Sequence, residues 1–329
     1  MGDLVTGMHL VVTIPSLQWE NAPGGPGVHY GWQNSIGNAL VEWIDLKIGG
    51  QTIQRINGDL MEIYGQLFMD DSVQRGLKTS IGKVFPLGRG VTATPSGSNG
   101  EQRFIIPLPF YFHMKPSLAI PLCAITRQDV TLYVKFRDVI DLLYPLSAAA
   151  RDWAVKGNIY NVAFTQFIES LQLKNATILT DYVYITKEEI DIFNNRTIDF
   201  IITQNQRVSV EPVPAVSGTI QIDGQFVNPV KEFFVLVRRE SSFKLGAANF
   251  AYSNGTTYND AQHIFYLQND DNTGTNPPNH HLRTMELRLN NAPIVDSDVA
   301  DKLFLGSIQP MNRHSRVSDY GLIYVYSFS

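Results

Sequence analysis

The stretch of sequence that decides the fold reads Ile36-Gly-Asn-Ala-Leu-Val-Glu-Trp-Ile-Asp-Leu-Lys-Ile-Gly-Gly-Gln-Thr-Ile-Gln-Arg-Ile56. Apolar side chains fall on even positions between 36 and 48, which places them on one face of a β-strand. Gly49-Gly50 favours a hairpin turn, because both glycines accept positive φ. Residues 51–56 then return as the partner strand. The stretch therefore predicts an antiparallel hairpin with one buried face.

Similar β patterns recur on both sides of this hairpin. In the first half of the chain they lie at Leu4–Ile14, Arg103–Phe112, Val130–Phe136 and Leu171–Ile185. In the second half they lie at Ile198–Val210, Thr219–Ile222, Lys231–Arg238, Met285–Leu289, Leu303–Ile308 and Leu322–Phe328. Pro107 and Pro109 cannot donate to a ladder, so their run belongs at a sheet edge or bend. Phe233–Val237 is apolar throughout, which predicts a central strand buried on both faces.

Helical patterns are few. Asp59 is placed to cap a helix whose apolar residues follow at i, i+3, i+4, i+7 and i+8 from Leu60 to Phe68. The polar run Lys187–Asn194 predicts a short connecting helix, and Asp138–Gly157 reads as an insertion. Many short strands with few helices are typical of β-sandwiches or barrels. We expect an all-β protein of two consecutive domains, residues 1–187 and 188–329.

Composition limits the classes of function. The 329 residues carry 26 Lys and Arg against 31 Asp and Glu, a net charge of −5, with no basic block. Wrapping nucleic acid needs dense positive charge, so direct nucleic-acid binding is not expected. Only 17% of residues are charged, which favours a neutral polar surface in contact with further copies of the chain. We expect no membrane span or signal peptide, and we expect the single cysteine, Cys123, to be a small buried residue.

No catalytic, cofactor or metal site is predicted. The motifs of P-loops, serine hydrolases and zinc proteases are all missing from the sequence. His280-His281 lacks a second spaced pair of ligands and reads as a solvated loop. The carboxylate pairs, expected at solvated turns or helix ends, are Asp70-Asp71, Glu188-Glu189 and Asp270-Asp271. The remaining histidines have no nucleophile nearby in sequence: His9, His29, His113, His263 and His314.

Several segments, in this order along the chain, resemble the major capsid proteins of nucleocytoplasmic large DNA viruses. They are Gly2–Val5, Ile36–Leu40, Ile44–Gln51, Phe104–Phe112, Leu118–Leu122, Leu179–Ile185, Asn228–Glu232 and Ile323–Phe328. The resemblance implies a double jelly roll, in which each domain is an eight-stranded antiparallel sandwich. It implies that three chains form a pseudo-hexagonal homotrimer, the capsomer, and that many capsomers tile an icosahedral virus shell assembled in the host cytoplasm.

The resemblance also implies partners. These are neighbouring capsomers, minor capsid proteins and, through other proteins, an internal membrane. Family members begin upstream of Gly2 and continue beyond Phe328, so we expect the chain to be a fragment with an incomplete second sandwich. Contacts between copies are expected in the loops Trp19–Trp32, Gly88–Gly100, Asp138–Gly157 and Ser241–Asp260.

Two alternatives remain open from the sequence. One is a minor capsid or scaffold protein of the same fold. The other is a carbohydrate-binding β-sandwich, in which exposed tryptophans stack on sugars. The four tryptophans are Trp19, Trp32, Trp43 and Trp153, and Trp43 lies within an alternating strand, which favours packing over sugar binding.

Overall fold

The fold is known from a computed structural model of the chain. It describes residues 2–15, 30–83, 101–145, 162–208, 218–238, 256–259, 264–267, 280, 282–318 and 322–328. The strands of the first half are β1 (Leu4–Ile14), β2 (Tyr30–Trp32), β3 (Val41–Ile48), β4 (Gln51–Asn57), β5 (Gln102–Pro107), β6 (Ile120–Pro121), β7 (Val130–Phe136), β8 (Leu143–Pro145) and β9 (Asn175–Val183). The helices of this half are α1 (Ile36–Leu40), α2 (Gly58–Leu67), α3 (Asp71–Ile81), α4 (Tyr111–Met114), η2 (Pro116–Leu118), η3 (Val139–Leu142) and α6 (Val162–Ser170).

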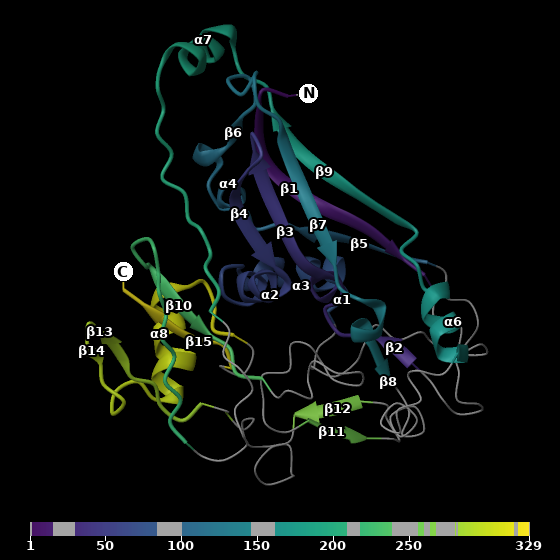
Figure 1. The fold of residues 1–329 in the computed structure, drawn as a ribbon, viewed down its shortest axis with the longest axis vertical. Helices are drawn as coiled ribbons and strands as arrows, with labels where there is room; N and C mark the ends of the chain where they lie inside the picture. Colours follow the sequence, from purple (N-terminus) through teal and green to yellow (C-terminus); the bar gives the residue numbers. More distant parts are fainter. Residues whose placement is uncertain are drawn as a thin grey trace.

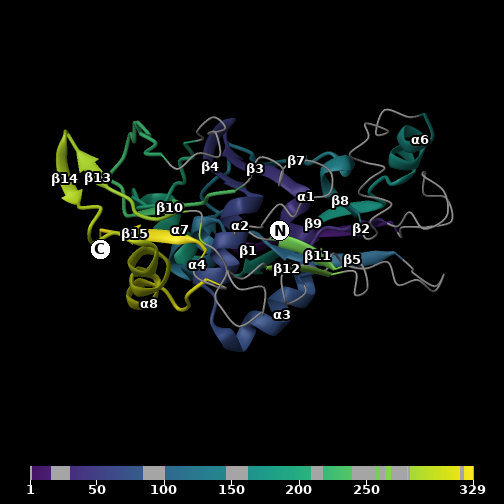
Figure 2. The same ribbon diagram turned by 90° about the horizontal axis from the view of Figure 1, so that it is seen from below.

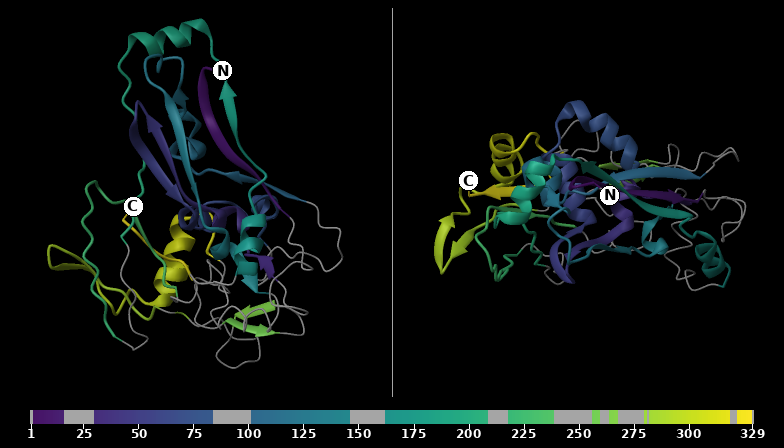
Figure 3. Two further views of the ribbon diagram at one scale, coloured as in Figure 1. Left: turned by 45° about the vertical axis from the view of Figure 1, so that its right-hand side comes forward. Right: turned by 90° about the horizontal axis from the view of Figure 1, so that it is seen from above.

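The first half is a sandwich of two antiparallel sheets. In one sheet β1 is central, with β9 on one side and β5 and the short β6 also paired to it. In the other sheet β3 is central between β4 and β7. The two layers run along the long axis of the molecule (Figures 1 and 3). Their inner faces share one core, in which Leu10, Val12, Ile44 and Leu46 are all buried.

The predicted hairpin is confirmed in position and turn. β3 pairs with β4 from Trp43–Asn57 to Ile48–Gln51, and Gly49 and Gly50 both have positive φ, 58° and 83°. The first five residues of the predicted strand instead form α1. Ile36 and Leu40 are four residues apart, a spacing that fits one helical face as well as one strand face, so periodicity alone could not separate them.

Three helices, α1, α2 and α3, pack at the lower end of the sandwich (Figure 1). The predicted cap of α2 is wrong by two residues. Asn57 caps the helix, because its Oδ1 accepts the N–H of Leu60 at 2.8 Å, and Asp59 lies inside the first turn. Gly58 lies so close to α1 that a Cβ at this position would meet the carbonyl oxygens of Asn38 at 2.3 Å and Val41 at 2.8 Å.

Replacing Gly58 with alanine is expected to lower the free energy of unfolding by about 1–3 kcal/mol, because the added methyl group would press on backbone atoms. The matched control is Gly76→Ala in α3, where a Cβ meets no atom within 4 Å. This second change should be neutral or stabilise by about 0.5–1 kcal/mol. Urea unfolding of both variants measures the difference, and equal effects would contradict the close approach at Gly58.

Each sheet of the sandwich ends in an open edge. Within the described part of the chain, β9 bonds only to β1, and β7 bonds only to β3. Leu179 and Tyr182 on β9 and Tyr133 on β7 are exposed. The edge position of β5, predicted from its prolines, is confirmed: β5 pairs with β1 alone among these residues, and the chain turns into α4 after Phe110.

The second half begins with the predicted connecting helix, α7 (Lys187–Asn195), at the top of Figure 1. Thr186 and Glu189 form a reciprocal capping box at its start. The other elements are β10 (Glu232–Val235), β11 (Thr256–Asn259), β12 (Ile264–Leu267), β13 (Leu287–Leu289), β14 (Ala292–Val295), a π-helix (Phe304–Ile308), α8 (Gln309–Arg313) and β15 (Tyr324–Ser327). Seen from below, the C-terminal elements gather at one end of the molecule and α6 lies at the other (Figure 2).

Three strand predictions in this half are wrong. Ile198–Val208, the described part of one, and Thr219–Ile222 contain no strand and have no ladder partner among the described residues. Leu303–Ile308 is helical, because Asp301 Oδ1 accepts the Phe304 N–H at 2.7 Å and starts a helix there. A short apolar run fits a buried helix as well as a strand, and the local cap determines which one forms.

The strands β10 and β15 form a two-stranded ribbon between two apolar cores. Ile323 and Val325 pack into the core of the first sandwich, whereas Tyr324 belongs to a second core with Val295 and Leu305. Alternate side chains of β10 likewise pack into the first core and into the second core. The prediction of a central strand buried on both faces is only partly met. β10 packs on both faces, but its side chains are half-buried, and β15 is its one partner in the described part of the chain, so the strand is not central there.

Candidate functional site

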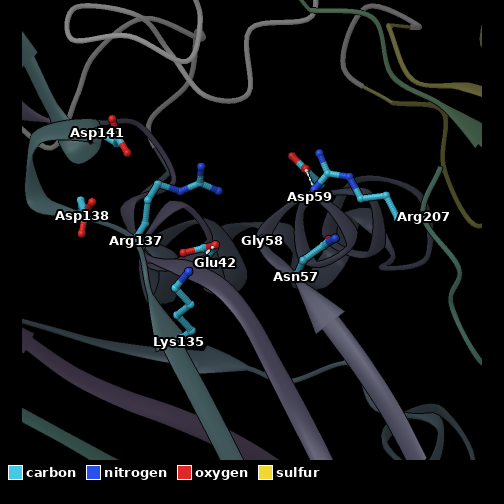
Figure 4. A pocket seen from close by; sticks show the side chains of 9 residues that line it. All are labelled: Glu42, Asn57, Gly58, Asp59, Lys135, Arg137, Asp138, Asp141 and Arg207. Atoms are coloured by element: carbon cyan, nitrogen blue, oxygen red, sulfur yellow. Dashed lines mark hydrogen bonds and ion pairs between the residues drawn. The ribbon is translucent and has the colours of Figure 1, made fainter. Parts of the chain in front are cut away.

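A polar hollow lies where β3, β4 and β7 approach the second half (Figure 4). It is a cavity of about 410 Å³. Its lining consists of Glu42, Asn57, Gly58, Asp59, Lys135, Arg137, Asp138, Asp141 and Arg207. Four carboxylates thus face three cations, and no His, Cys, Ser or Thr lines the cavity.

Several charges of this cavity are engaged with one another or with the backbone. Lys135 Nζ lies 2.9 Å from Glu42 Oε1, and Arg137 Nε donates to the carbonyl oxygen of Ala39 at 3.0 Å. Burial raises the pKa of Asp141, and the nearby Asp138 and Glu42 add to this rise against the opposing charge of Arg137. Several of the charges in the lining pair with one another or with residues of the second half, which is the make-up of an ionic junction.

Asp59 is the centre of this junction. Arg238 donates to both of its carboxylate oxygens, Nη1 to Oδ1 at 2.8 Å and Nη2 to Oδ2 at 3.2 Å. Arg207 Nη1 lies 3.5 Å from Oδ2 on the same carboxylate. Because both arginines are distant in sequence, one carboxylate of α2 connects the first sandwich to two segments of the second half. Figure 4 shows its pairing with Arg207.

A second contact between the halves is made by aromatic rings. His314 follows α8, and its imidazole packs edge-on against Phe68 at the end of α2, with ring centroids 4.6 Å apart. Phe234 of β10 lies 6.0 Å from the same imidazole. Arg316 extends the contact, because its N–H donates to the Leu67 carbonyl at 3.2 Å and its Nε lies 2.5 Å from Asp71.

A buried ionic network stabilises the base of the first sandwich. Glu62 accepts hydrogen bonds from Lys83, from Asn38 at 2.9 Å and from Gln66 at 2.8 Å. Burial by itself would raise the pKa of Glu62, but Lys83 and these hydrogen bonds outweigh it and hold the pKa below its ordinary value. Glu62 and Lys83 are both buried. The network is structural, because its donors and acceptors satisfy one another without a ligand.

The histidines and carboxylates picked out from the sequence do not assemble into a site. His9 and His113 lie with ring centroids 5.8 Å apart, and the described residues contain no group of three side chains able to hold a metal ion. His280 is not a solvated loop residue as expected, because its Nδ1 lies 3.0 Å from the Tyr324 hydroxyl. Burial raises the pKa of Tyr324 to about 12. His29, His263, His281 and Asp270-Asp271 lie outside the described residues.

The remaining carboxylate pairs and the cysteine are near the surface. Asp70-Asp71 and Glu188-Glu189 are exposed at the beginnings of α3 and α7, as predicted. Cys123 is a free thiol that is half-buried rather than fully buried, and burial, with Asp3 nearby, raises its pKa.

The two described tryptophans pack within the protein. Trp32 is buried, and its Nε1 donates to the Pro15 carbonyl at 3.3 Å. Trp43 is half-buried beneath the guanidinium of Arg55, whose carbon lies 4.6 Å from the ring centroid. Trp19 and Trp153 lie outside the described residues.

The loops expected to contact other copies lie mostly beyond the described residues. Gly88–Gly100 is entirely outside, and of Ser241–Asp260 only β11 is described. The described ends of Trp19–Trp32 and Asp138–Gly157 are β2 and β8, which pair from Tyr30–Pro145 to Trp32–Leu143. These two loops, which are far apart in sequence, are therefore adjacent where β2 pairs with β8. No helix among the described residues is long and apolar enough to cross a membrane.

Sequence reasoning missed the junction residues Asp59, Arg238 and His314 and the buried pair Glu62–Lys83. Arg238 gave a usable signal, because it directly follows an apolar strand, whereas Glu62 lies off the predicted apolar face of its helix and gave none. Charged residues in such surroundings need a partner, but the sequence does not say which one.

Two solved structures with a similar arrangement come from virus capsids. The chain aligns over its whole length with "PBCV-1 virus capsid, quasi-atomic model", with a TM-score of 0.71 at 20% identity, and covers 71% of that chain. It also aligns over its whole length with "Faustovirus major capsid protein", with a TM-score of 0.63 at 11% identity, covering 78% of that chain. The fold is that of the double jelly-roll capsid proteins.

Sequence comparison gives the family. "Capsid protein 1" of Acanthamoeba polyphaga mimivirus is 29% identical over 239 residues, which are 71% of this chain and 38% of the relative. "Major capsid protein" of Phaeocystis pouchetii virus is 25% identical over 259 residues, 73% of this chain and 47% of the relative. The chain therefore spans less than half the length of these relatives. The family described as "Major capsid protein N-terminus" matches residues 1–186, and the chain belongs to this family of large DNA virus capsid proteins.

Proposed function

We propose that the chain is a structural protein of a virus shell, without enzymatic activity, that acts by binding copies of itself. Three copies form a pseudo-hexagonal capsomer, and capsomers tile an icosahedral capsid that is assembled in the host cytoplasm. The observation that carries the proposal is the alignment of the whole chain with a virus capsid structure. The charge network of the polar cavity, which leaves no catalytic pair in its lining, supports a structural role.

The proposed domains are residues 1–187 and 188–329, each one jelly roll. In the first, the described part of the chain supplies three long strands to each sheet, with β9 and β5 at the edges of one sheet and β4 and β7 at the edges of the other. One further strand paired to each sheet would bring the sandwich to the eight strands expected. Unpaired backbone groups and exposed apolar side chains on β9 favour such pairing.

Self-association is supported by the surface. Ile201 is 92% exposed, Val227 84% and Tyr184 74%, and all three lie on segments after β9. Large apolar side chains in such number are typical of surfaces covered by further polypeptide. Minor capsid proteins and neighbouring capsomers are the proposed partners, with an internal membrane reached only through other proteins.

Light scattering on the full-length polypeptide tests the trimer. We expect a mass of three chains at micromolar concentration, because obligate assemblies commonly bury about 2,000 Å² or more. A mass of one chain at every concentration would contradict the proposal.

Copy number distinguishes a major shell protein from the alternative, a minor capsid or scaffold protein. A major shell protein dominates the protein content of the virion, and a minor one does not. Quantitative mass spectrometry of purified particles measures this ratio.

A further inference from the structure

His314 occupies an unusual position for an ionisable group. Its side chain is 1% exposed, and neither ring nitrogen has a hydrogen-bond partner among the described residues. It lies where three elements meet: α8, the end of α2 and β10. A neutral imidazole fits this apolar contact, whereas a charged one has no donor–acceptor partner there.

The charged groups around His314 are few. Glu232 of β10 is nearest, with Oε2 3.8 Å from His314 Nε2, beyond hydrogen-bond distance. The other oxygen of Glu232 lies 3.5 Å from Lys231 Nζ, so its charge is shared. Arg316, two residues along the chain, pairs with Asp71 of α3.

The same imidazole holds the β10–β15 ribbon against the first sandwich. Phe234, on the face of β10 that packs into the first core, contacts both His314 and Phe68 in a cluster of three rings. β15 is bound to β10 over Tyr324–Ser327. Displacing the imidazole would therefore loosen the ribbon at the point where the two halves of the chain meet.

We propose that His314 acts as a pH-dependent lock between the two halves. In its neutral form the imidazole packs between Phe68 and Phe234. When the imidazole takes up a proton, it leaves this contact and releases the β10–β15 ribbon. This goes beyond the proposed structural function, because it adds a response to acid within each chain.

The direction of the response follows from the surroundings. Burial lowers the pKa of His314, with Glu232 opposing and Lys231 adding to the shift. The unfolded or released imidazole therefore takes the proton first as the pH falls below its ordinary value of about 6.5. The contact is fully stabilised above that pH, and its stability is lost progressively as the pH falls from there through the lowered pKa of the packed imidazole.

Native-state hydrogen exchange on the 329-residue chain at about pH 7.5 and pH 5 tests the lock. After correction for the intrinsic pH dependence of exchange, we expect amides of β10 and β15 to lose about tenfold or more protection in acid, while β1 and β9 keep theirs. In His314→Phe, the acid effect on the ribbon should vanish, because phenylalanine keeps the ring contacts without a titrating group.

Two further variants test whether the response belongs to His314. His113→Phe replaces another partly buried histidine, one that packs on Tyr64 in the first half, and should leave the response of the ribbon unchanged. Glu232→Gln removes the nearby negative charge, which lowers the pKa of the packed imidazole further, so the ribbon should lose more protection at about pH 5 than in the natural chain. The lock is overturned if acid leaves ribbon protection unchanged, if β1 and β9 open in step with the ribbon, or if His314→Phe responds like the natural chain. None of these readouts depends on trimer formation.

Discussion

Replacing Lys83 with methionine is expected to lower the free energy of unfolding by about 3–5 kcal/mol, because it leaves the carboxylate of Glu62 charged and unpaired in the core. Lys83 is the one cation among the three hydrogen-bond donors to Glu62. The amides of Asn38 and Gln66 remain in the variant, but they do not neutralise the charge. Urea unfolding at neutral pH measures the loss.

The double variant Glu62→Gln with Lys83→Met is the control. It removes both charges and keeps the shapes, so it should recover most of the lost stability. The pH dependence gives a second check. The pKa of Glu62 lies below its ordinary value in the folded chain, so the stabilisation is present above that ordinary value and is lost as the pH falls through the lowered one. The difference in free energy of unfolding between the natural chain and Lys83→Met should therefore become smaller in acid. A difference that is independent of pH would contradict the ionic account.

Truncating Phe110 to alanine is expected to cost about 3–5 kcal/mol, because it removes a large ring from a packed core and leaves a cavity. Phe110 is fully buried and stacks on Phe112, with ring centroids 5.6 Å apart and planes inclined by 20°. The midpoint of urea unfolding should fall with little change in its slope.

Tyr133→Ala on β7 is the matched control. This aromatic side chain is 52% exposed, and the Nζ of Lys47 lies 4.4 Å from its ring centroid. Its truncation should cost about 1 kcal/mol or less. Equal losses for the two variants would mean that Phe110 is not part of the core.

Strands with alternating residues could be predicted closely from the sequence. β1 and β7 begin and end where the pattern does, and the Gly49-Gly50 turn lies where two glycines allow positive φ. These features depend on neighbours in the chain. The segment Ile198–Val208 shows the limit, because its strand-like pattern has no ladder partner among the described residues. A strand needs a second strand, which its own sequence cannot supply.

The candidate site also depends on contacts that the sequence alone does not predict. The prediction that the chain carries no catalytic constellation stays a prediction, because an absence from part of a chain does not test it. The ionic junction was not foreseen, since Arg207 and Arg238 meet Asp59 across about 150 and 180 residues of sequence. Nor was the environment of His314, which reads as one of several scattered histidines until Phe68 and Phe234 are placed beside it.

The sequence by itself determined the β class, the hairpin, the connecting helix α7 and, through the order of its motifs, the capsid family. These are set by local periodicity, turn chemistry and the order of segments along one chain. Only the tertiary structure decided that β10 and β15 separate two cores, that Glu62 and Lys83 neutralise each other, and that His314 lies in a buried contact between the halves. Such features arise from long-range packing, where the burial of a charge or an imidazole depends on residues far away in the chain.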